Sequence, residues 1–128
     1  MTQTKKYAVL LPGDESQWAA ASPDERAATY ARHEQFMKLL HERGHELLGG
    51  AELTHSRGTH QVRGDLDAVT VTEGPFAETT EQLTGFYLVG TADLDDLLNL
   101  CGLLADGQEA NSAPVEVREV VTDGGDAS

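Results

Sequence analysis

Two kinds of hydrophobic spacing alternate along the chain. Short runs that are continuously apolar, or apolar at every second residue, predict β-strands. They lie at Lys5–Pro12, His45–Leu48, Thr59–Arg63, Ala68–Thr72, Gly85–Val89 and Val115–Val121. Between them, two stretches carry apolar residues at the spacing of an amphipathic helix. The predicted order is therefore strand, helix, strand, hairpin, strand, helix, strand.

The first helix has recognisable ends. Ser22 is a good N-cap residue, and Glu25 follows at the position that completes a capping box. Gly44 suits the residue after a helix C-terminus. These signals predict a helix over residues 23–43. Its apolar face consists of Tyr30, His33, Phe36, Met37 and Leu40.

A second helix is predicted after Asp93, another good N-cap residue. Its apolar stripe consists of Leu94, Leu97, Leu98, Cys101 and Leu104. Residues 14–21, which contain Trp18, and residues 73–83 are expected to be loops. The polar segment 122–128 is expected to be a disordered tail.

This order predicts a single α+β domain over residues 1–121. Two helices that each bury one stripe can pack on one face of a mostly antiparallel sheet, which is a ferredoxin-like plan with an added hairpin. Two helices cannot cover the second face of the sheet. A second copy of the chain can, so we expect a homodimer.

Charge and cysteine content narrow the class of protein. Lys and Arg number 9 against 22 Asp and Glu, for a formal net charge of -13. This balance argues against nucleic acid or an anionic membrane as a partner, because both require a basic face. The single cysteine, Cys101, cannot form an intrachain disulfide. Without a secretory signal or a long apolar stretch, the sequence predicts a cytoplasmic protein.

His33 is the strongest candidate for chemistry, since an imidazole on the sheet-facing stripe can act as a general acid or base. The alternative is a partly buried structural histidine. The two differ in the expected pKa: burial lowers it below about 6.5, whereas a nearby carboxylate raises it. A pKa near or above that value is expected of a catalytic His33, with Glu73 or Glu78 as the carboxylate.

Several other residue patterns allow either a functional role or a purely structural one. The bend at Glu73 can present Glu73 and Phe76 to a pocket, or form a structural corner with Phe76 in the core. Glu78 and Thr80 can bind a polar ligand or cap a turn. The segment His41–His45 matches H-E-x-x-H, but Gly44 should end the helix between the two histidines, so no metal or cofactor is expected.

One segment resembles a known family. The run EGPFAETTEQLTGFYL at residues 73–88 is similar to the signature of the DGPF branch of the YCII-related family. The run GHELLGGAEL at 44–53 and the closing VEVR at 115–118 are also similar, so that the likeness spans about residues 5–121. Glu73 departs from the pattern, since the signature usually begins with Asp.

The resemblance implies a dimeric α+β barrel with a pocket beside the sheet. It implies no particular reaction, although the wider family offers a histidine and an aspartate as candidates for catalysis. His33 matches the family's histidine, and Asp106 is the nearest candidate for the aspartate. We expect a small organic ligand that contacts a set of polar and aromatic side chains, namely Tyr30, Phe76, Glu78, Thr80 and Tyr87. The alternative is a non-catalytic ligand-binding or interaction module, which the resemblance associates with a sigma-factor-type regulator.

Overall fold

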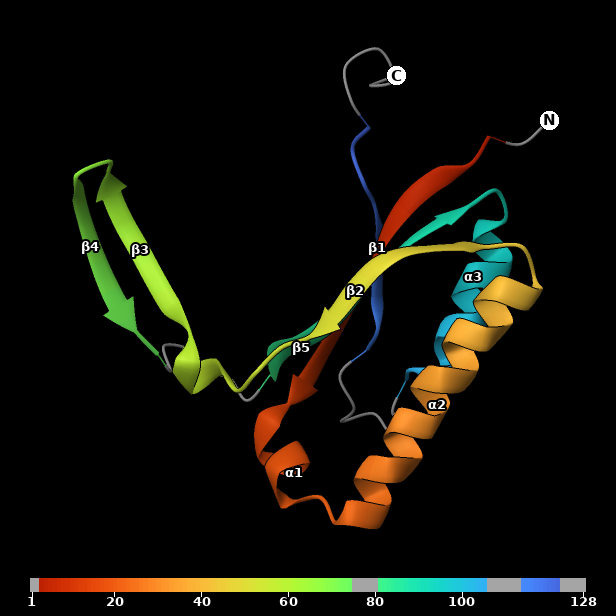
Figure 1. Ribbon diagram of the computed structural model, residues 1–128, viewed down its shortest axis with the longest axis horizontal. Coiled ribbons are helices and arrows are strands. Elements are labelled where there is room, and N and C mark those ends of the chain that lie inside the picture. The colour runs from red at the N-terminus through yellow and green to blue at the C-terminus, as the bar shows by residue number, and fades with distance from the viewer. Residues whose placement is uncertain (1–2, 75–80, 106–113, 123–128) are drawn as a thin grey trace.

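The computed structural model describes residues 3–74, 81–105 and 114–122 (Figure 1). Its elements follow the chain as β1 (Lys5–Asp14), α1 (Glu15–Ala20), α2 (Pro23–Glu42), β2 (Glu46–Glu52), the short 3-10 helix η1 (Ser56–Gly58), β3 (His60–Asp65), β4 (Ala68–Glu73), β5 (Glu81–Thr91), α3 (Leu94–Leu100), the 3-10 helix η2 (Cys101–Leu103) and β6 (Glu116–Glu119). Strands and helices follow the predicted order, with additions described below.

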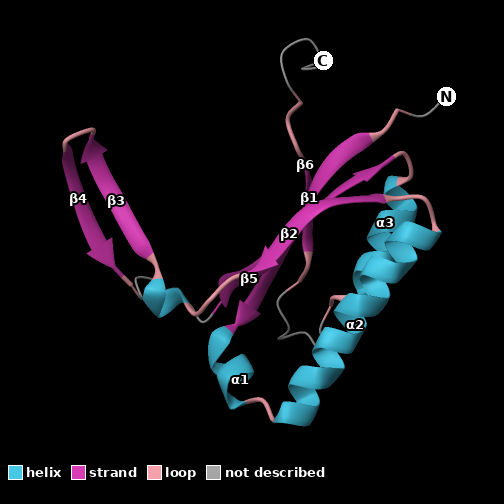
Figure 2. Ribbon diagram, in the orientation of Figure 1, coloured by secondary structure: helices cyan, strands magenta, loops and turns pink. Residues whose placement is uncertain are grey.

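A four-stranded sheet in the order β2-β5-β1-β6 forms the centre of the fold (Figure 2). All its neighbouring strands are antiparallel. Strand β1 pairs with β5 along its whole length, from Lys5 opposite Thr91 to Asp14 opposite Glu81. Helices α2 and α3 lie on the same side of the sheet. This arrangement is compatible with the expected ferredoxin-like α+β fold.

The core lies between that sheet face and the two helices. Alternation along β1 places Tyr7 and Val9 on the helix side, and both are buried. They form one cluster with Val89 of β5, Phe36 and Leu40 of α2, and Leu97, Leu100 and Cys101 of α3 and η2. The cluster joins all layers of the fold, so the helices are held by apolar packing from the centre of the sheet.

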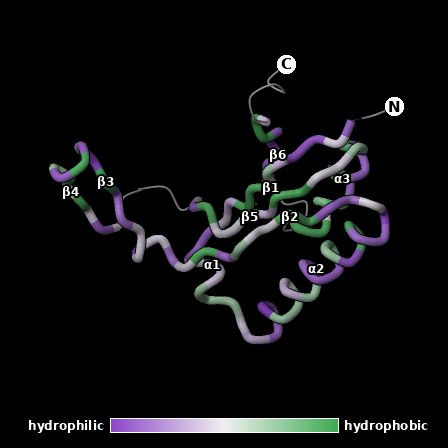
Figure 3. The backbone as a smooth tube through the Cα atoms, turned by 45° about the horizontal axis from the view of Figure 1, so that its top comes forward, coloured by the Kyte–Doolittle hydropathy of each residue, from purple (hydrophilic) through white to green (hydrophobic). Residues whose placement is uncertain are grey.

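The opposite face of the sheet is also apolar. Ala8 and Leu10 pair with Leu88 and Phe86 in the strand register, and alternation turns all four away from the buried cluster. The hydropathy colouring shows the hydrophobic character of these central strands (Figure 3). Each of the four side chains is half-buried.

Strands β3 and β4 form a separate two-stranded sheet that projects from the body of the molecule (Figure 1). Val62 lies directly opposite Val71, and Val69 falls on the same face by alternation. All three valines are more than half exposed. The predicted hairpin is confirmed, and it is inserted between β2 and β5.

The first predicted helix is confirmed almost to the residue. Ser22 accepts a hydrogen bond from the Glu25 backbone, and the Glu25 carboxylate accepts one from the Ser22 backbone. Helix α2 ends at Glu42, and Gly44 has a positive φ of 83°. That conformation favours glycine, so Gly44 stops the helix as expected.

Three local predictions are wrong. Residues Glu15–Ala20 are a helix and not a loop, because the Asp14 carboxylate caps it by accepting from the Ser16 and Gln17 backbones. Strand β2 does not end before Gly49 but continues to Glu52. Strand β5 begins at Glu81, inside the segment expected to be a loop.

The second helix is shorter than predicted and its buried stripe differs. Regular α-helix ends at Leu100 and gives way to η2, which tightens the last turn. Leu100 is buried, whereas Leu98 is 46% exposed. Asp93 is the N-cap, as expected, because its carboxylate accepts from the Asp96 backbone.

A polar link joins the ends of α2, β5 and α3. The buried His45 ring bonds Thr91 Oγ1 through Nδ1 at 2.7 Å and Asp96 Oδ2 through Nε2 at 2.8 Å. Asp96 also accepts from Arg43 Nη1 at 2.8 Å. Both ring nitrogens of His45 are therefore occupied, and the buried polar group is satisfied.

We predict that Asp96 contributes a pH-dependent part of the stability. The hydrogen bond from His45 and the nearby Arg43 guanidinium hold the Asp96 pKa below its usual 3.8. The stabilisation is therefore complete above that value and is lost as the pH falls through the lower pKa of the folded state. Asp96→Asn should lower the free energy of unfolding at neutral pH, as measured by urea denaturation.

In acid, wild type and Asp96→Asn should converge in stability as Asp96 becomes protonated. Asp95→Asn is the matched control, since Asp95 is an exposed acid in the same helical turn. An equal loss in both variants at neutral pH would contradict the prediction.

Candidate functional site

The candidate site is built around His33 on α2. His33 Nδ1 lies 2.6 Å from the hydroxyl oxygen of Tyr87 on β5. The Tyr87 ring lies with its centroid 5.8 Å from that of His33 and 5.2 Å from that of Phe36. Phe36 is fully buried one helical turn beyond His33, so core packing fixes the distance between the helix and the tyrosine.

A carboxylate from the edge strand completes the site. The Tyr30 hydroxyl lies 3.1 Å and 3.2 Å from the two carboxylate oxygens of Glu52, the last residue of β2. Tyr30 and His33 are neighbours on the same face of α2. The charge of Glu52 acts on both His33 and Tyr87. Two helical residues and two strand residues therefore meet in one cluster.

Gly50 makes the position of Tyr87 possible. It lies opposite Tyr87 in the strand register. A Cβ at Gly50 would be 2.9 Å from Tyr87 Cδ1 and 2.6 Å from the Phe86 carbonyl oxygen. Those distances are too short for any side chain, so the close approach of β2 and β5 beside His33 requires glycine.

Helix α1 adds an aromatic side chain beside the site. The Trp18 ring contacts Tyr30 edge-on, with centroids 5.6 Å apart. The Arg26 guanidinium lies 5.3 Å from the Trp18 ring centroid, and its Nη2 donates to the Trp18 and Ala19 carbonyl oxygens. These contacts fasten α1 to the start of α2 and set the Tyr30 ring in place.

Burial and the Glu52 charge shift the pKa of His33 in opposite directions. Desolvation lowers its pKa from 6.5, the Glu52 carboxylate opposes that shift, and Arg32 adds to it. Desolvation and then Glu52 raise the pKa of Tyr87. At neutral pH both side chains are therefore uncharged. The lowered His33 pKa is the direction expected of a structural histidine, and the carboxylate that opposes it is not Glu73.

The predicted site residues fall into three groups. Tyr30, His33 and Tyr87 come together in the cluster. Glu73 lies exposed at the end of β4, where its carboxylate is 3.4 Å from His60 Nε2 on the neighbouring strand. The remaining predictions, Phe76, Glu78, Thr80 and Asp106, lie outside the described residues.

The sequence pattern does not predict Glu52 as a site residue. The glycine pair before it predicts the end of a strand, which places Glu52 in a loop. Alternation along a continued strand places it on the same face as Gly50, beside the helices. The sequence therefore held the signal, but only for a strand that runs through two glycines.

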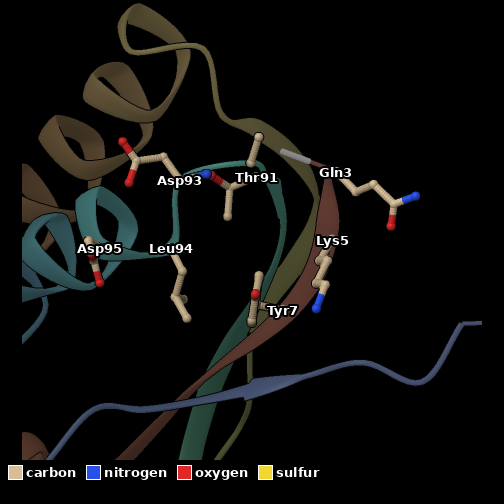
Figure 4. A pocket seen from close by; sticks show the side chains of 8 residues that line it. Gln3, Lys5, Tyr7, Thr91, Asp93, Leu94 and Asp95 are labelled. Carbon is tan, nitrogen blue, oxygen red and sulfur yellow. The ribbon is translucent and has the colours of Figure 1, made fainter. Parts of the chain in front are cut away.

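A separate hollow of about 590 Å³ lies near the N-terminal end of β1 (Figure 4). It is lined by Gln3, Lys5, Tyr7, Thr91, Ala92, Asp93, Leu94 and Asp95. None of these was predicted as a site residue. Lys5 forms an ion pair with Glu119 at 3.7 Å, and Asp93 caps α3, so two of its charged groups already have structural partners.

The other candidates for chemistry have structural roles. Cys101 is buried, and desolvation raises the pKa of its thiol to about 11, which disfavours the thiolate. His41 lies in the last turn of α2, whereas His45 follows the end of the helix. Among the described residues, no group of three or more His, Cys, Asp or Glu side chains could hold a metal ion.

None of the described helices is long and apolar enough to cross a membrane.

Fold and site together describe a small α+β domain with a histidine–tyrosine pair between its long helix and its sheet. Residues 5–122 match the model of the YCII-related domain, and the chain belongs to that family. It is also similar to an uncharacterized protein, R00369, of Rhizobium meliloti (strain 1021). The two are 34% identical over 112 residues, which cover 88% of this chain and 89% of the relative.

We predict that Glu52 keeps the His33 pKa higher than burial alone would make it. In wild type the pKa should lie below 6.5, because desolvation is the larger influence. Glu52→Gln should lower it further, since the carboxylate that favours the imidazolium is removed. NMR titration of the imidazole measures both values.

Glu73→Gln serves as the control, because it removes a carboxylate from the hairpin and should leave the His33 pKa unchanged. A wild-type value at or above 6.5, or a rise in Glu52→Gln, would overturn this account of the site.

Proposed function

We propose that the cluster of Tyr30, His33, Glu52 and Tyr87 binds a small organic molecule, and that His33 exchanges a proton with it. The observation that carries the proposal is the 2.6 Å contact between His33 and Tyr87 in a half-buried site next to a carboxylate. Perturbed titratable groups that meet in this way are typical of functional sites.

The protonation states suit such a role. An uncharged imidazole can release the hydrogen of one ring nitrogen as the other nitrogen takes up a proton, so it can exchange a proton near neutral pH while its net charge stays zero. The aromatic rings of Tyr30, Tyr87 and Trp18 offer apolar contact area, and Glu52 and the phenols offer polar contacts. The ligand is therefore expected to combine an apolar body with a few polar atoms.

A second function, binding without catalysis, is favoured by the direction of the His33 pKa. Desolvation outweighs the carboxylate, as expected of a histidine that serves structure. In that case the same cluster holds a ligand, and no proton moves to or from it.

We propose in addition that the chain belongs to the DGPF branch of the family and works in the cytoplasm. The EGPFAETTEQLTGFYL run supports the branch, with Tyr87 of that run reaching the site. The sequence features described above support the location.

We also propose a homodimer formed through the outer face of the sheet. Ala8, Leu10, Phe86 and Leu88 make this face apolar, and α2 and α3 lie on the other side. Such a face is self-complementary about a two-fold axis, and burying it removes apolar surface from water. Two sheets packed face to face in this way give the expected dimeric α+β barrel.

The first prediction from these proposals concerns the ligand. Native mass spectrometry, or analysis of small molecules released by denaturation, should find an organic molecule in purified wild-type protein. His33→Gln should retain less of it. His60→Gln is the matched control, since His60 lies on the exposed hairpin, and it should retain as much as wild type.

Proton exchange is then tested in deuterium oxide. Wild type should introduce carbon-bound deuterium into the identified molecule, and His33→Gln saturated with the molecule should not. Retention of the molecule without deuterium incorporation by wild type would favour the non-catalytic function. Equal retention by wild type and His33→Gln would contradict both functions at this site.

The dimer prediction is that light scattering at micromolar protein gives twice the chain mass of 13.8 kDa. Leu88→Lys places a charge on the outer face and should shift the protein towards monomer. Leu98→Lys, a change at an exposed position on α3, should leave the mass at that of the dimer. A monomeric wild type would exclude the dimer.

A further inference from the structure

We propose that the Tyr87 hydroxyl donates its proton to His33 Nδ1, fixing the Nε2–H tautomer, so that the site offers a hydrogen-bond donor to a carbonyl oxygen of an uncharged substrate. This inference rests on the proposed function, and it assigns the roles of donor and acceptor within the site. Tyr87 is then a positioning residue, and His33 is the residue that meets the substrate.

The geometry of the pair decides which partner donates. A contact of 2.6 Å is shorter than the usual range for an N–H donor and lies within that of an O–H donor. A phenol is a strong donor, and the unprotonated imidazole nitrogen is a strong acceptor. If Nδ1 carried the proton instead, the Tyr87 hydroxyl hydrogen would have to turn to water, since no other described residue accepts it.

The surroundings keep the proton on Tyr87. The hydroxyl is half-buried, and the Glu52 carboxylate acts against ionisation of the phenol. The Tyr30 hydroxyl donates to the Glu52 carboxylate, and no hydrogen bond between Tyr87 and Glu52 is found among the described residues. Glu52 therefore acts on His33 and Tyr87 through its charge, and the Tyr87 hydroxyl can donate its hydrogen bond to His33.

The second ring nitrogen is the one available to a substrate. His33 Nε2 has no partner among the described residues. It is also not a buried, unpaired atom, since Arg26 Nε alone has that status in the described part of the chain. With Nδ1 accepting from Tyr87, the neutral ring must carry its hydrogen on Nε2. His33 then exchanges a proton with the substrate by releasing the Nε2 hydrogen to the substrate oxygen as Nδ1 takes up the Tyr87 proton.

A neutral imidazole N–H aimed at a carbonyl oxygen polarises the carbonyl and stabilises negative charge that develops on its oxygen. The nearby guanidinium groups direct their hydrogen bonds at backbone carbonyls, although Arg32 keeps its charge close enough to act on His33. Arg26 donates to the carbonyls of α1, and Arg32 donates to the carbonyls of Gly102, Leu103 and Ala105. The Glu52 charge repels anions. The site therefore suits a ketone, ester or amide better than a carboxylate or phosphate.

The tautomer is read by NMR of the full-length, uniformly ¹⁵N-labelled protein. Long-range proton–nitrogen correlations distinguish a ring nitrogen that carries hydrogen from one that does not, and His33→Gln identifies the His33 signals. In wild type above the His33 pKa, Nε2 should carry the hydrogen and Nδ1 should show the shift of a hydrogen-bonded acceptor. A hydrogen on Nδ1 would overturn the proposal.

Tyr87→Phe removes the donor but keeps the ring that packs on Phe36. Its Nδ1 signal should move to that of an acceptor without a hydrogen bond, and the Nδ1–H tautomer should become detectable. Tyr30→Phe is the matched control, because it removes a phenol from Glu52 and leaves the His33–Tyr87 bond intact. An unchanged His33 spectrum in a folded Tyr87→Phe would overturn the proposal.

The substrate class is tested with two probes of similar size, cyclohexanone and cyclohexanecarboxylate. The ketone should shift the Nε2 signal of wild type more than the carboxylate does, and this preference should weaken in Tyr87→Phe. A stronger response to the carboxylate, or no response to either, would reject the substrate class. The tautomer is measured without ligand, so a missing ligand or missing proton exchange would refute the proposed function while the tautomer result stands on its own.

Discussion

The packing of α2 against the centre of the sheet is the interaction on which the site depends. Phe36 and Leu40 are fully buried in one cluster with Val9 and Val89. His33 lies one turn before Phe36, so the same face of the helix that enters the core also carries the imidazole over the sheet. A shift of the helix would change the core and the His33–Tyr87 contact together.

Two histidines show how differently the fold can treat the same side chain. Both ring nitrogens of the buried His45 are taken up by Thr91 and Asp96, which leaves no atom for a ligand. Among the described residues, only one nitrogen of His33 has a partner, and the His33 side chain is half-buried. The contrast is the reason that the proposed function centres on His33 and not on the H-E-x-x-H pattern around His45.

The sequence predicted the elements that local signals define. The capping box at Ser22, the stop at Gly44 and the alternating valines of the hairpin act over a few residues, and each was found in the structure. Helix α1 carried a signal of the same kind in Asp14 but is short and lacks buried residues. An amphipathic pattern could not reveal it.

The site was only partly predictable, because it joins residues distant in the chain. Helical spacing placed Tyr30 and His33 on one face, and the family resemblance included Tyr87. Glu52 could not be predicted as a site residue, because glycines normally weaken a strand. Here the strand continues, and Gly50 is required because Tyr87 lies so close to it. Which carboxylate reaches His33 depends on strand register, and register is a property of the assembled sheet.

The hairpin also bears on how this fold can vary. Glu52 lies opposite Gly85, and the Leu53 backbone donates to the Thr84 carbonyl at 2.8 Å, so the chain leaves and re-enters the sheet at adjacent points. Closing a longer loop between points already held together adds little entropic cost. The inserted segment can therefore lengthen, shorten or be replaced by a tight turn during evolution, while the strand register that carries Tyr87 and Glu52 is preserved.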